Sequence, residues 1–429
     1  MVNNRRDFSN KLIQGSVLGE WFQPMITALD KVRFSDKKFS ALPMSAFILF
    51  GCLRQIQSTA SLRAQIQDLF HLDPQRSTPP LARSTWSDAL ASSQRGKTLT
   101  TALTYLIAYA QQTLPDRLAH IEGLGERPVI ATDASYLHES AHYCPVYKKA
   151  GGNDNQKGHM MLSHYDLRKG IPLAATTQTR SIGEILVLKQ DELAANAWLR
   201  VKNAIHVVDR AFIDGRYWDK RFEMFGSSVI TRMKSILKYT VEKERSVALN
   251  QANKGVLSDR EVTLKCSKRR WRLVGFRSPD GIEYEYLTND LMLEPGVVAF
   301  LYYRRWDKEK YYDSFKNDLA GTKAWAKSPI AIEQQALMGI VTVVLMRLFL
   351  QRRQQDLQLE KMDGTQDRKH QIKQDIANRT SEANSYRASW TQLSKITRQA
   401  WRFLKSCFMQ KHGLRLYQRQ LRPLLLRYL

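Results

Sequence analysis

Apolar residues recur at helical spacing through the first part of the chain. Between Ala46 and Ile56 they fall on one face of a helix. A second short helix is expected to open near Arg83, with Ser84 as its N-cap. Two short helices around a turn suit a helix-turn-helix reader of DNA, although any small helical bundle has the same pattern. We therefore predict that residues 1–120 form a helical DNA-binding domain.

From Arg127 on, the helical spacing gives way to short apolar runs bounded by turn residues. Two of these runs are followed directly by an aspartate, as expected of buried strands that end at a loop. Strands that alternate with helices predict an α/β layer structure. The expected strands are 128–132, 159–167, 171–176, 204–208 and 227–232, and the expected helix is 192–201.

Residues 235–290 follow another pattern, in which apolar and polar positions alternate. The alternation around Trp271 and again around Tyr284 is typical of strands with one buried face. Between them, Ser278 to Gly281 carries the residues of a tight turn. This stretch is therefore predicted to be a β-rich insertion, built as a meander or a pair of hairpins.

Residues 295–321 are predicted to form one helix, because Pro295 suits its first turn and Gly321 suits its end. At about 100° per residue, four functional side chains would lie within an arc of roughly 60° beside the buried face. Such an alignment indicates a site, and a basic amphipathic helix with incidental charges is the alternative. The four residues are Tyr302, Arg305, Glu309 and Lys316.

The formal net charge of +25 at pH 7 indicates a polyanionic partner. Nucleic acid fits better than a membrane because no strongly amphipathic terminal anchor is evident, and basicity that only aids solubility is the alternative. After Glu382 the chain contains no Asp or Glu, while Lys and Arg accumulate beside an apolar stripe. Residues 351–429 are therefore predicted to form a basic helical region that contacts DNA or a partner subunit.

The remaining composition argues against several classes of protein. The 4 cysteines are scattered without a zinc-site spacing, which favours a reducing compartment. No uncharged apolar run reaches the length of about 18 residues that a membrane span needs. The N-terminus lacks the apolar core of a secretory signal. We therefore expect a cytoplasmic protein without a membrane partner.

Three acidic residues stand at special positions, with Asp133 and Asp209 at strand ends and Glu309 on the helix edge. Chemistry collects at the carboxyl ends of parallel strands, where loops begin. An aspartate that ends a strand is more often a turn or cap residue, and for either one alone this reading stays open. Together, three carboxylates in a basic protein predict a site for divalent cations, two of which can drive phosphoryl transfer.

The spacing Tyr302-x2-Arg305-x3-Glu309-x6-Lys316 resembles the Y-R-E-K signature of bacterial insertion-sequence transposases of family four, a branch of the DDE transposases. Other segments resemble that family's two aspartate motifs, the strand that follows them and the end of its insertion. The resemblance is strong from about Arg127 to Leu350 and loose outside. The supporting segments are 132–135, 208–214, 230–234 and 287–289, with looser ones at 61–63 and 83–85.

The resemblance implies an RNase H-like catalytic core across residues 121–350, with the β-rich insertion at about 235–290. Asp133, Asp209 and Glu309 would then be catalytic residues and ligands of two magnesium ions, for which manganese would substitute. The chain departs from the family in one respect. Asp307 and Lys308 precede Glu309 where relatives often have an apolar residue, so the packing of this helix is left open.

The resemblance also implies contacts with the transposon-end DNA. Tyr302, Arg305 and Lys316 would lie near the cleaved phosphate. Excision through a hairpin intermediate requires a flipped base stacked on an aromatic side chain. Trp271 is the candidate for that platform, and packing of the insertion is its alternative role. Arg210, Arg232 and Lys234, beside the matched motifs, are further predicted DNA contacts, and Arg210 could instead pair with Asp209.

The function that follows is a DNA transposase that cuts and rejoins phosphodiester bonds by a two-metal DDE mechanism. Its partners would be double-stranded DNA, namely terminal inverted repeats and target DNA, and a second copy of the chain in a homodimer. A metal-dependent nuclease without strand transfer and a domesticated DNA-binding protein are the alternatives. The bacterial family implies a nucleoid-associated protein of the cytoplasm.

Overall fold

The computed structural model describes residues 17–35, 38–39, 42–56, 83–138, 146–148, 155–178, 182–193, 197–313, 325–326 and 328–362. The chain divides into two compact units, one of residues 1–114 with 314–429 and the other of residues 115–313. The predicted division at residues 120 and 350 stays a prediction. Residues 61–63, Lys316 and the basic tail beyond Met362 lie outside the described residues.

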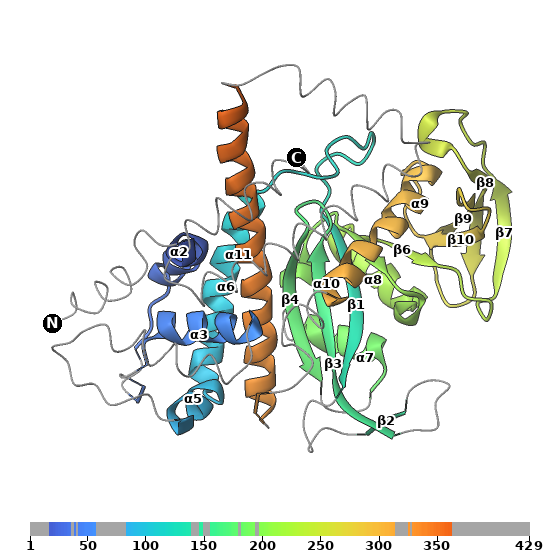
Figure 1. Cartoon of the computed structure of the whole chain (residues 1–429). Helices are drawn as coiled ribbons and strands as arrows, with labels where there is room; N and C mark the ends of the chain where they lie inside the picture. The colour runs from blue at the N-terminus through green and yellow to red at the C-terminus, as the bar shows by residue number, and fades with distance from the viewer. Residues whose placement is uncertain are drawn as a thin grey trace, which may run out of the picture. The chain divides into compact units, whose positions relative to one another are not determined.

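The first unit is helical where it is described (Figure 1). Its longest helix, α11, packs along α2, α3, α5 and α6. Ser92 caps α6 by accepting a hydrogen bond from the Arg95 amide. The predicted cap Ser84 instead lies inside α5, which begins one residue earlier, so that prediction was wrong. The helices are α2 (Val17–Asp30), α3 (Met44–Ile56), α5 (Arg83–Leu90), α6 (Ser93–Thr113) and α11 (Pro329–Met362).

Helix α11 is long and apolar enough, over Pro329–Arg353, to cross a membrane by length and composition. Most of that stretch is buried inside the protein, as in the core helix of a soluble protein, which passes the same test. The segment between α3 and α5 lies outside the described residues, so the helix-turn-helix stays a prediction.

The second unit is built on a mixed ten-stranded sheet with the order β2-β3-β1-β5-β6-β10-β9-β8-β7, and β4 pairs with β3. Strands β1, β5 and β6 run parallel, and the other pairs are antiparallel. The strands are β1 (Val129–His138), β2 (Val146–Lys148), β3 (Asn155–Asp166), β4 (Ile171–Gln178), β5 (Ile205–Val208), β6 (Ser228–Arg232), β7 (Tyr239–Glu244), β8 (Val256–Leu264), β9 (Arg270–Arg277) and β10 (Glu283–Thr288).

Several predicted elements are confirmed and two are corrected. Strands β5 and β6 and the β3–β4 hairpin lie where the apolar runs placed them. Strand β1 does not end at Asp133, because antiparallel pairing with β3 continues it to His138. The helix predicted at 192–201 is wrong, since α7 spans Glu184–Leu193 and only a short 3-10 helix, Ala197–Arg200, follows.

The β-rich structure predicted for residues 235–290 is confirmed as the meander β7–β8–β9–β10. Its tight turn forms between Ser278 and Gly281, where the Gly281 amide donates to the Ser278 carbonyl over 2.9 Å. Gly281 has a φ of 84°, a conformation that favours glycine. The meander extends the main sheet, because β10 pairs directly with β6.

Helices cover the two faces of the sheet, and alternate residues of one strand show which helix covers which face. On β10, Leu287 joins a buried cluster with Trp218 of α8 (Gly215–Phe225). Its neighbour Tyr286 points the other way and contacts Tyr302 of α9 (Pro295–Arg304), with ring centroids 4.9 Å apart. Helix α7 shares the face of α8, and α10 (Trp306–Asp313) continues the course of α9 (Figure 1).

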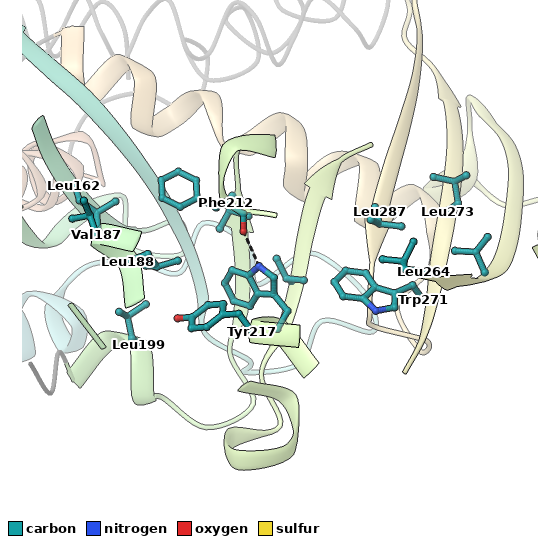
Figure 2. Close-up of a cluster of buried hydrophobic side chains, with 14 of the residues drawn as sticks. Leu162, Val187, Leu188, Leu199, Phe212, Tyr217, Leu264, Trp271, Leu273 and Leu287 are labelled. Atoms are coloured by element: carbon teal, nitrogen blue, oxygen red, sulfur yellow. Dashed lines mark hydrogen bonds between the residues drawn. The ribbon is translucent and has the colours of Figure 1, made fainter. Parts of the chain in front are cut away.

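Trp271 belongs to the interior of this fold. Its side chain is 0% exposed and packs in the cluster with Leu264, Leu273 and Leu287 (Figure 2). The indole N–H donates to Ser267 Oγ over 2.7 Å, so its one polar atom is also satisfied. A base cannot stack on a ring that is enclosed in this way. The burial of Trp271 argues against the predicted base-stacking role and favours the alternative, packing of the insertion.

Candidate active site at the carboxyl edge of β1 and β5

Asp133 and Asp209 lie at the same edge of the sheet. Strand β5 ends at Val208, whose partner on β1 is Thr132. Asp133 is therefore the first β1 residue beyond its parallel neighbour, and Asp209 is the first residue after β5. The two positions therefore lie at the ends of neighbouring pairing segments on this edge. Both acids lie at this edge of the sheet, although β1 itself continues past Asp133.

The helix that carries Glu309 is interrupted, contrary to the prediction of one continuous helix. Helix α9 ends at Arg304 and α10 begins at Trp306. At the junction the Arg305 amide donates to the Tyr302 carbonyl over 3.0 Å, and the Lys308 amide donates to the Arg305 carbonyl over 3.0 Å. These contacts span three residues, as in a 3-10 turn. The turn leaves Arg305 and Glu309 adjacent.

The Arg305 guanidinium joins two of the predicted acids. Its Nη1 lies 3.1 Å from Asp133 Oδ2, and its Nη2 lies 2.7 Å from Glu309 Oε1. Burial lowers the pKa of Arg305, but the Asp133, Tyr302 and Glu309 side chains outweigh it and raise that pKa overall. This cation therefore stays charged and occupies the position between two carboxylates.

The three acids lie within electrostatic reach of one another. The pKa of Glu309 is raised first by burial, which Arg305 opposes, and further by the carboxylates of Asp133 and Asp209. Asp209 precedes the 3-10 helix η2 (Arg210–Phe212), but its side chain makes no capping hydrogen bond there. Its carboxylate is therefore available to a ligand, which weakens the reading of Asp209 as a cap residue.

Two side chains of α10 hold the main chain at Asp133. Lys308 is fully buried. Its Nζ donates to the Asp133 carbonyl oxygen over 2.9 Å and also to the Ser163 carbonyl oxygen. Tyr312, one helical turn later, donates its hydroxyl to the Asp133 carbonyl over 2.7 Å. Burial lowers the pKa of Lys308 to about 7, against the opposing effect of Asp133. These contacts fix the strand on which Asp133 stands.

The sequence left the packing around Asp307 open, and the structure shows this residue buried beside two arginines. Asp307 is 4% exposed and pairs with Arg304 Nη2 at 2.7 Å. Arg117 Nη1 lies 3.8 Å from the same carboxylate. A buried charge is tolerated when an opposite charge is close to it. Asp307 and Lys308 therefore anchor α10 on the sheet and leave the neighbouring Glu309 side chain partly exposed, at 31%.

A fourth acid near the site was missed from the sequence. Glu184 lies in the first turn of α7 and is partly buried. Its pKa is raised to about 7, first by burial and then by the carboxylates of Asp133 and Asp209. The sequence signal was present, because Glu184 precedes the apolar pair Val187 and Leu188 at helical spacing. Placing the helix at 192–201 hid it.

The predicted DNA contacts fall into different environments. Tyr302 is 7% exposed, its ring is stacked under Arg305 at 5.5 Å, and burial raises its pKa. Arg232 lies over the Tyr284 ring at 4.9 Å. Arg210 is exposed and makes no ion pair with Asp209 in the described structure. Lys234 is partly buried within electrostatic reach of Glu184.

The oxygen-only donor set of this site suits a hard divalent cation such as Mg²⁺ or Mn²⁺. Among the described residues, no three Asp, Glu, His or Cys side chains stand at metal-ligand distance. The reason is visible at Arg305, whose guanidinium takes the place between Asp133 and Glu309 as a stand-in cation. The donor chemistry of the acids thus suits such a metal, and in this structure Arg305 balances the charge of two of them.

Residues 125–345, more than half of the chain, match the family model described as "Transposase DDE domain". The chain is also similar to the solved "Cryo-EM structure of piggyBac transposase synaptic complex with hairpin DNA (SNHP)", at 9% identity and a TM-score of 0.40, over 80% of this chain and 74% of that chain. No curated protein matches the sequence. The matched stretch includes Asp133, Asp209 and Glu309.

Proposed function

The chain belongs to the transposase DDE domain family, and from this premise we propose that Asp133, Asp209 and Glu309 are its catalytic acids. The observation that carries the proposal is that the Arg305 guanidinium joins Asp133 to Glu309, while Asp209, directly after the neighbouring strand β5, lies within electrostatic reach. In this proposal they hold two magnesium ions for cleavage and rejoining of DNA strands, and manganese substitutes for magnesium.

We infer that the core is RNase H-like. Strands β4, β3 and β1 form an antiparallel run, and β5 and β6 follow parallel to β1. The first two acids then sit on the adjacent central strands, and the helix after the insertion brings the third. The spacing of Tyr302, Arg305 and Glu309 supports membership of insertion-sequence family four, with Lys316 as the last residue of the signature.

The bound metals would supply activation of the attacking oxygen and stabilisation of the leaving oxygen. The protein's own residues position the strand. Lys308 and Tyr312 hold the Asp133 main chain. Arg305, once released from its carboxylates, is placed to grip a phosphate through two N–H groups. The Tyr302 ring, whose centroid lies 5.5 Å from the guanidinium carbon, packs against it.

The remaining steps of the proposed reaction follow the family resemblance. Water is the first nucleophile, a DNA 3′-hydroxyl is the second, and excision passes through a hairpin intermediate. Two copies of the chain pair the two terminal repeats, and the protein works in the bacterial cytoplasm at the nucleoid. The basic net charge of +25 supports the DNA partner, because it favours binding to a phosphate backbone.

A plasmid assay tests this function. A marker is placed between the DNA segments that flank the gene on either side, and the supercoiled plasmid is incubated with the full chain and Mg²⁺. We expect excised marker DNA together with joined products in which the marker has a new junction. Cut products without joined ones would indicate a nuclease. Binding without any nicking would indicate a DNA-binding protein that has lost catalysis.

In the same assay, Arg305→Ala is expected to reduce joined or hairpin products by about a hundredfold. This is the usual loss when a hydrogen-bond donor to the charge of the transition state is removed. Its affinity for end DNA should fall by only roughly a few-fold, because one phosphate contact among many is lost. The exposed Arg210→Ala is the matched control, with equal and small losses in both readouts. Equal losses for Arg305→Ala would show that Arg305 is only a phosphate clamp.

A further inference from the structure

Glu184 faces the catalytic edge of the sheet. It stands three and four residues before Val187 and Leu188, so the three side chains share one face of α7. Val187 and Leu188 are buried in the cluster that contains Phe212 of η2 and Leu162 of β3 (Figure 2). Helix α7 therefore packs on the segment that directly follows Asp209. One turn nearer the helix start, Glu184 lies within electrostatic reach of Asp209, the first residue after β5.

A second contact, an ion pair from the middle of α7, also holds this helix. Lys189 Nζ lies 2.7 Å from Asp214 Oδ2, in the loop after η2. The α7 face is thus tied to the Asp209 loop by apolar packing and by an ion pair. These contacts position α7 without a hydrogen bond or ion pair from Glu184 in the described structure.

The Glu184 carboxylate has no hydrogen bond or ion pair within the described part of the chain. It is nevertheless partly buried, and two further carboxylates, Asp133 and Asp209, lie within electrostatic reach. Asp209 likewise lacks a capping partner. Arg305 pairs with Asp133 and Glu309, on the side of α10. Two acids on the side of α7 are left with no bonded cation, which is costly for partly buried charges.

A purely structural role for Glu184 is the main alternative. A glutamate in the first turn of a helix interacts favourably with the helix dipole, which favours its charged form and lowers its pKa. The pKa of Glu184 is instead raised, because burial and the two aspartates disfavour the charge. The helix-dipole contribution is therefore outweighed, and Glu184 destabilises the metal-free protein when it is charged.

We propose that Glu184 is a fourth acidic residue of the active site, which supplies a carboxylate oxygen to the divalent cation held by Asp133 and Asp209. The proposal rests on the proposed function, since it adds a ligand to that metal site. Glu309 and Glu184 would then approach the two aspartates from α10 and α7 respectively. The two glutamates thus come from two different helices, and each lies within electrostatic reach of both aspartates.

Metal binding by the full chain tests the proposal without DNA and without catalysis. The probe is Mn²⁺ alone, titrated by electron paramagnetic resonance and by its effect on the melting temperature. Glu184→Gln keeps the size of the side chain and removes its charge. The control is Glu223→Gln, the same change at an exposed position on α8.

We expect Glu184→Gln to weaken Mn²⁺ binding by about tenfold or more, in the range seen for residues that support a metal site. Its metal-free melting temperature should equal or exceed that of the wild type, because a like-charge repulsion is removed. The rise in melting temperature on adding Mn²⁺ should shrink. Glu223→Gln should match the wild type in all three readouts.

Unchanged Mn²⁺ affinity in Glu184→Gln would overturn the proposal. If the metal-free melting temperature of this variant were also lower than that of the wild type, Glu184 would have a structural role. Asp209→Ala separates this failure from failure of the proposed function. If Asp209→Ala loses Mn²⁺ while Glu184→Gln keeps it, only the fourth ligand is wrong. If Asp209→Ala also keeps full Mn²⁺ affinity, the metal site itself is wrong.

Discussion

Asp209→Ala is expected to slow Mg²⁺-dependent cleavage of transposon-end DNA by about a thousandfold or more, equivalent to about 4 kcal/mol in the activation barrier. The reason is that Asp209 would be a ligand of the metal, and no side chain of the site supplies the activation that the metal provides. Its carboxylate makes no capping hydrogen bond, so removing it should leave the fold intact. A gel assay of strand cleavage under single-turnover conditions measures the loss.

The same variant should bind end DNA with nearly wild-type affinity, which a filter-binding or mobility-shift titration checks. Asp133→Ala and Glu309→Ala should lose cleavage to a similar degree. These two also release Arg305 from one of its partners, so a modest change in stability is expected alongside. Full cleavage by any of the three variants would contradict the assignment of the catalytic acids.

The strand-end aspartates illustrate what local sequence can predict. A buried apolar run followed by Asp209 identified β5 and its end, because the strand is buried on both faces and its length is set by that run. The same argument put the end of β1 at Asp133 and failed. Pairing with β3 on the other side carries β1 further, and a pairing partner distant in sequence leaves no local signal.

The helix of the predicted signature shows a second limit. Spacing correctly placed Arg305 next to Glu309, since a turn of either α or 3-10 geometry brings them together. The break at Arg305 was not predictable from propensity, because the segment contains no Gly or Pro there. Its cause lies in tertiary contacts, in which Lys308 and Tyr312 reach the main chain of β1 and β3.

Lys308 is the clearest departure from the family pattern that the resemblance implies. An amine stands at a fully buried position where relatives often have an apolar residue. The structure accommodates it by aiming its Nζ at two main-chain carbonyls and by placing the Tyr312 ring 5.1 Å away. The contact adds a donor to the strand that carries Asp133. Neither the charge nor the spacing of residues in the sequence predicted that Lys308 is buried while other lysines of the chain are exposed.

Trp271→Ala is expected to lower the free energy of unfolding by about 3–5 kcal/mol, the usual cost of truncating a fully buried tryptophan. The side chain is 0% exposed among Leu264, Leu273 and Leu287, so its loss leaves a cavity where the meander joins the main sheet. Trp271→Phe should cost less, because it keeps most of the packing and loses only the hydrogen bond to Ser267. Urea unfolding followed by circular dichroism measures both.

Trp306→Ala is the matched control, since this tryptophan is 54% exposed on α10 and should change stability by less than about 0.5 kcal/mol. The pair separates packing from DNA contact. If Trp271 only packs, its phenylalanine variant keeps DNA cleavage and joining at nearly the wild-type rate at temperatures where it is folded. A stable Trp271→Ala protein with a specific defect in hairpin formation would instead restore the base-stacking role that its burial argues against.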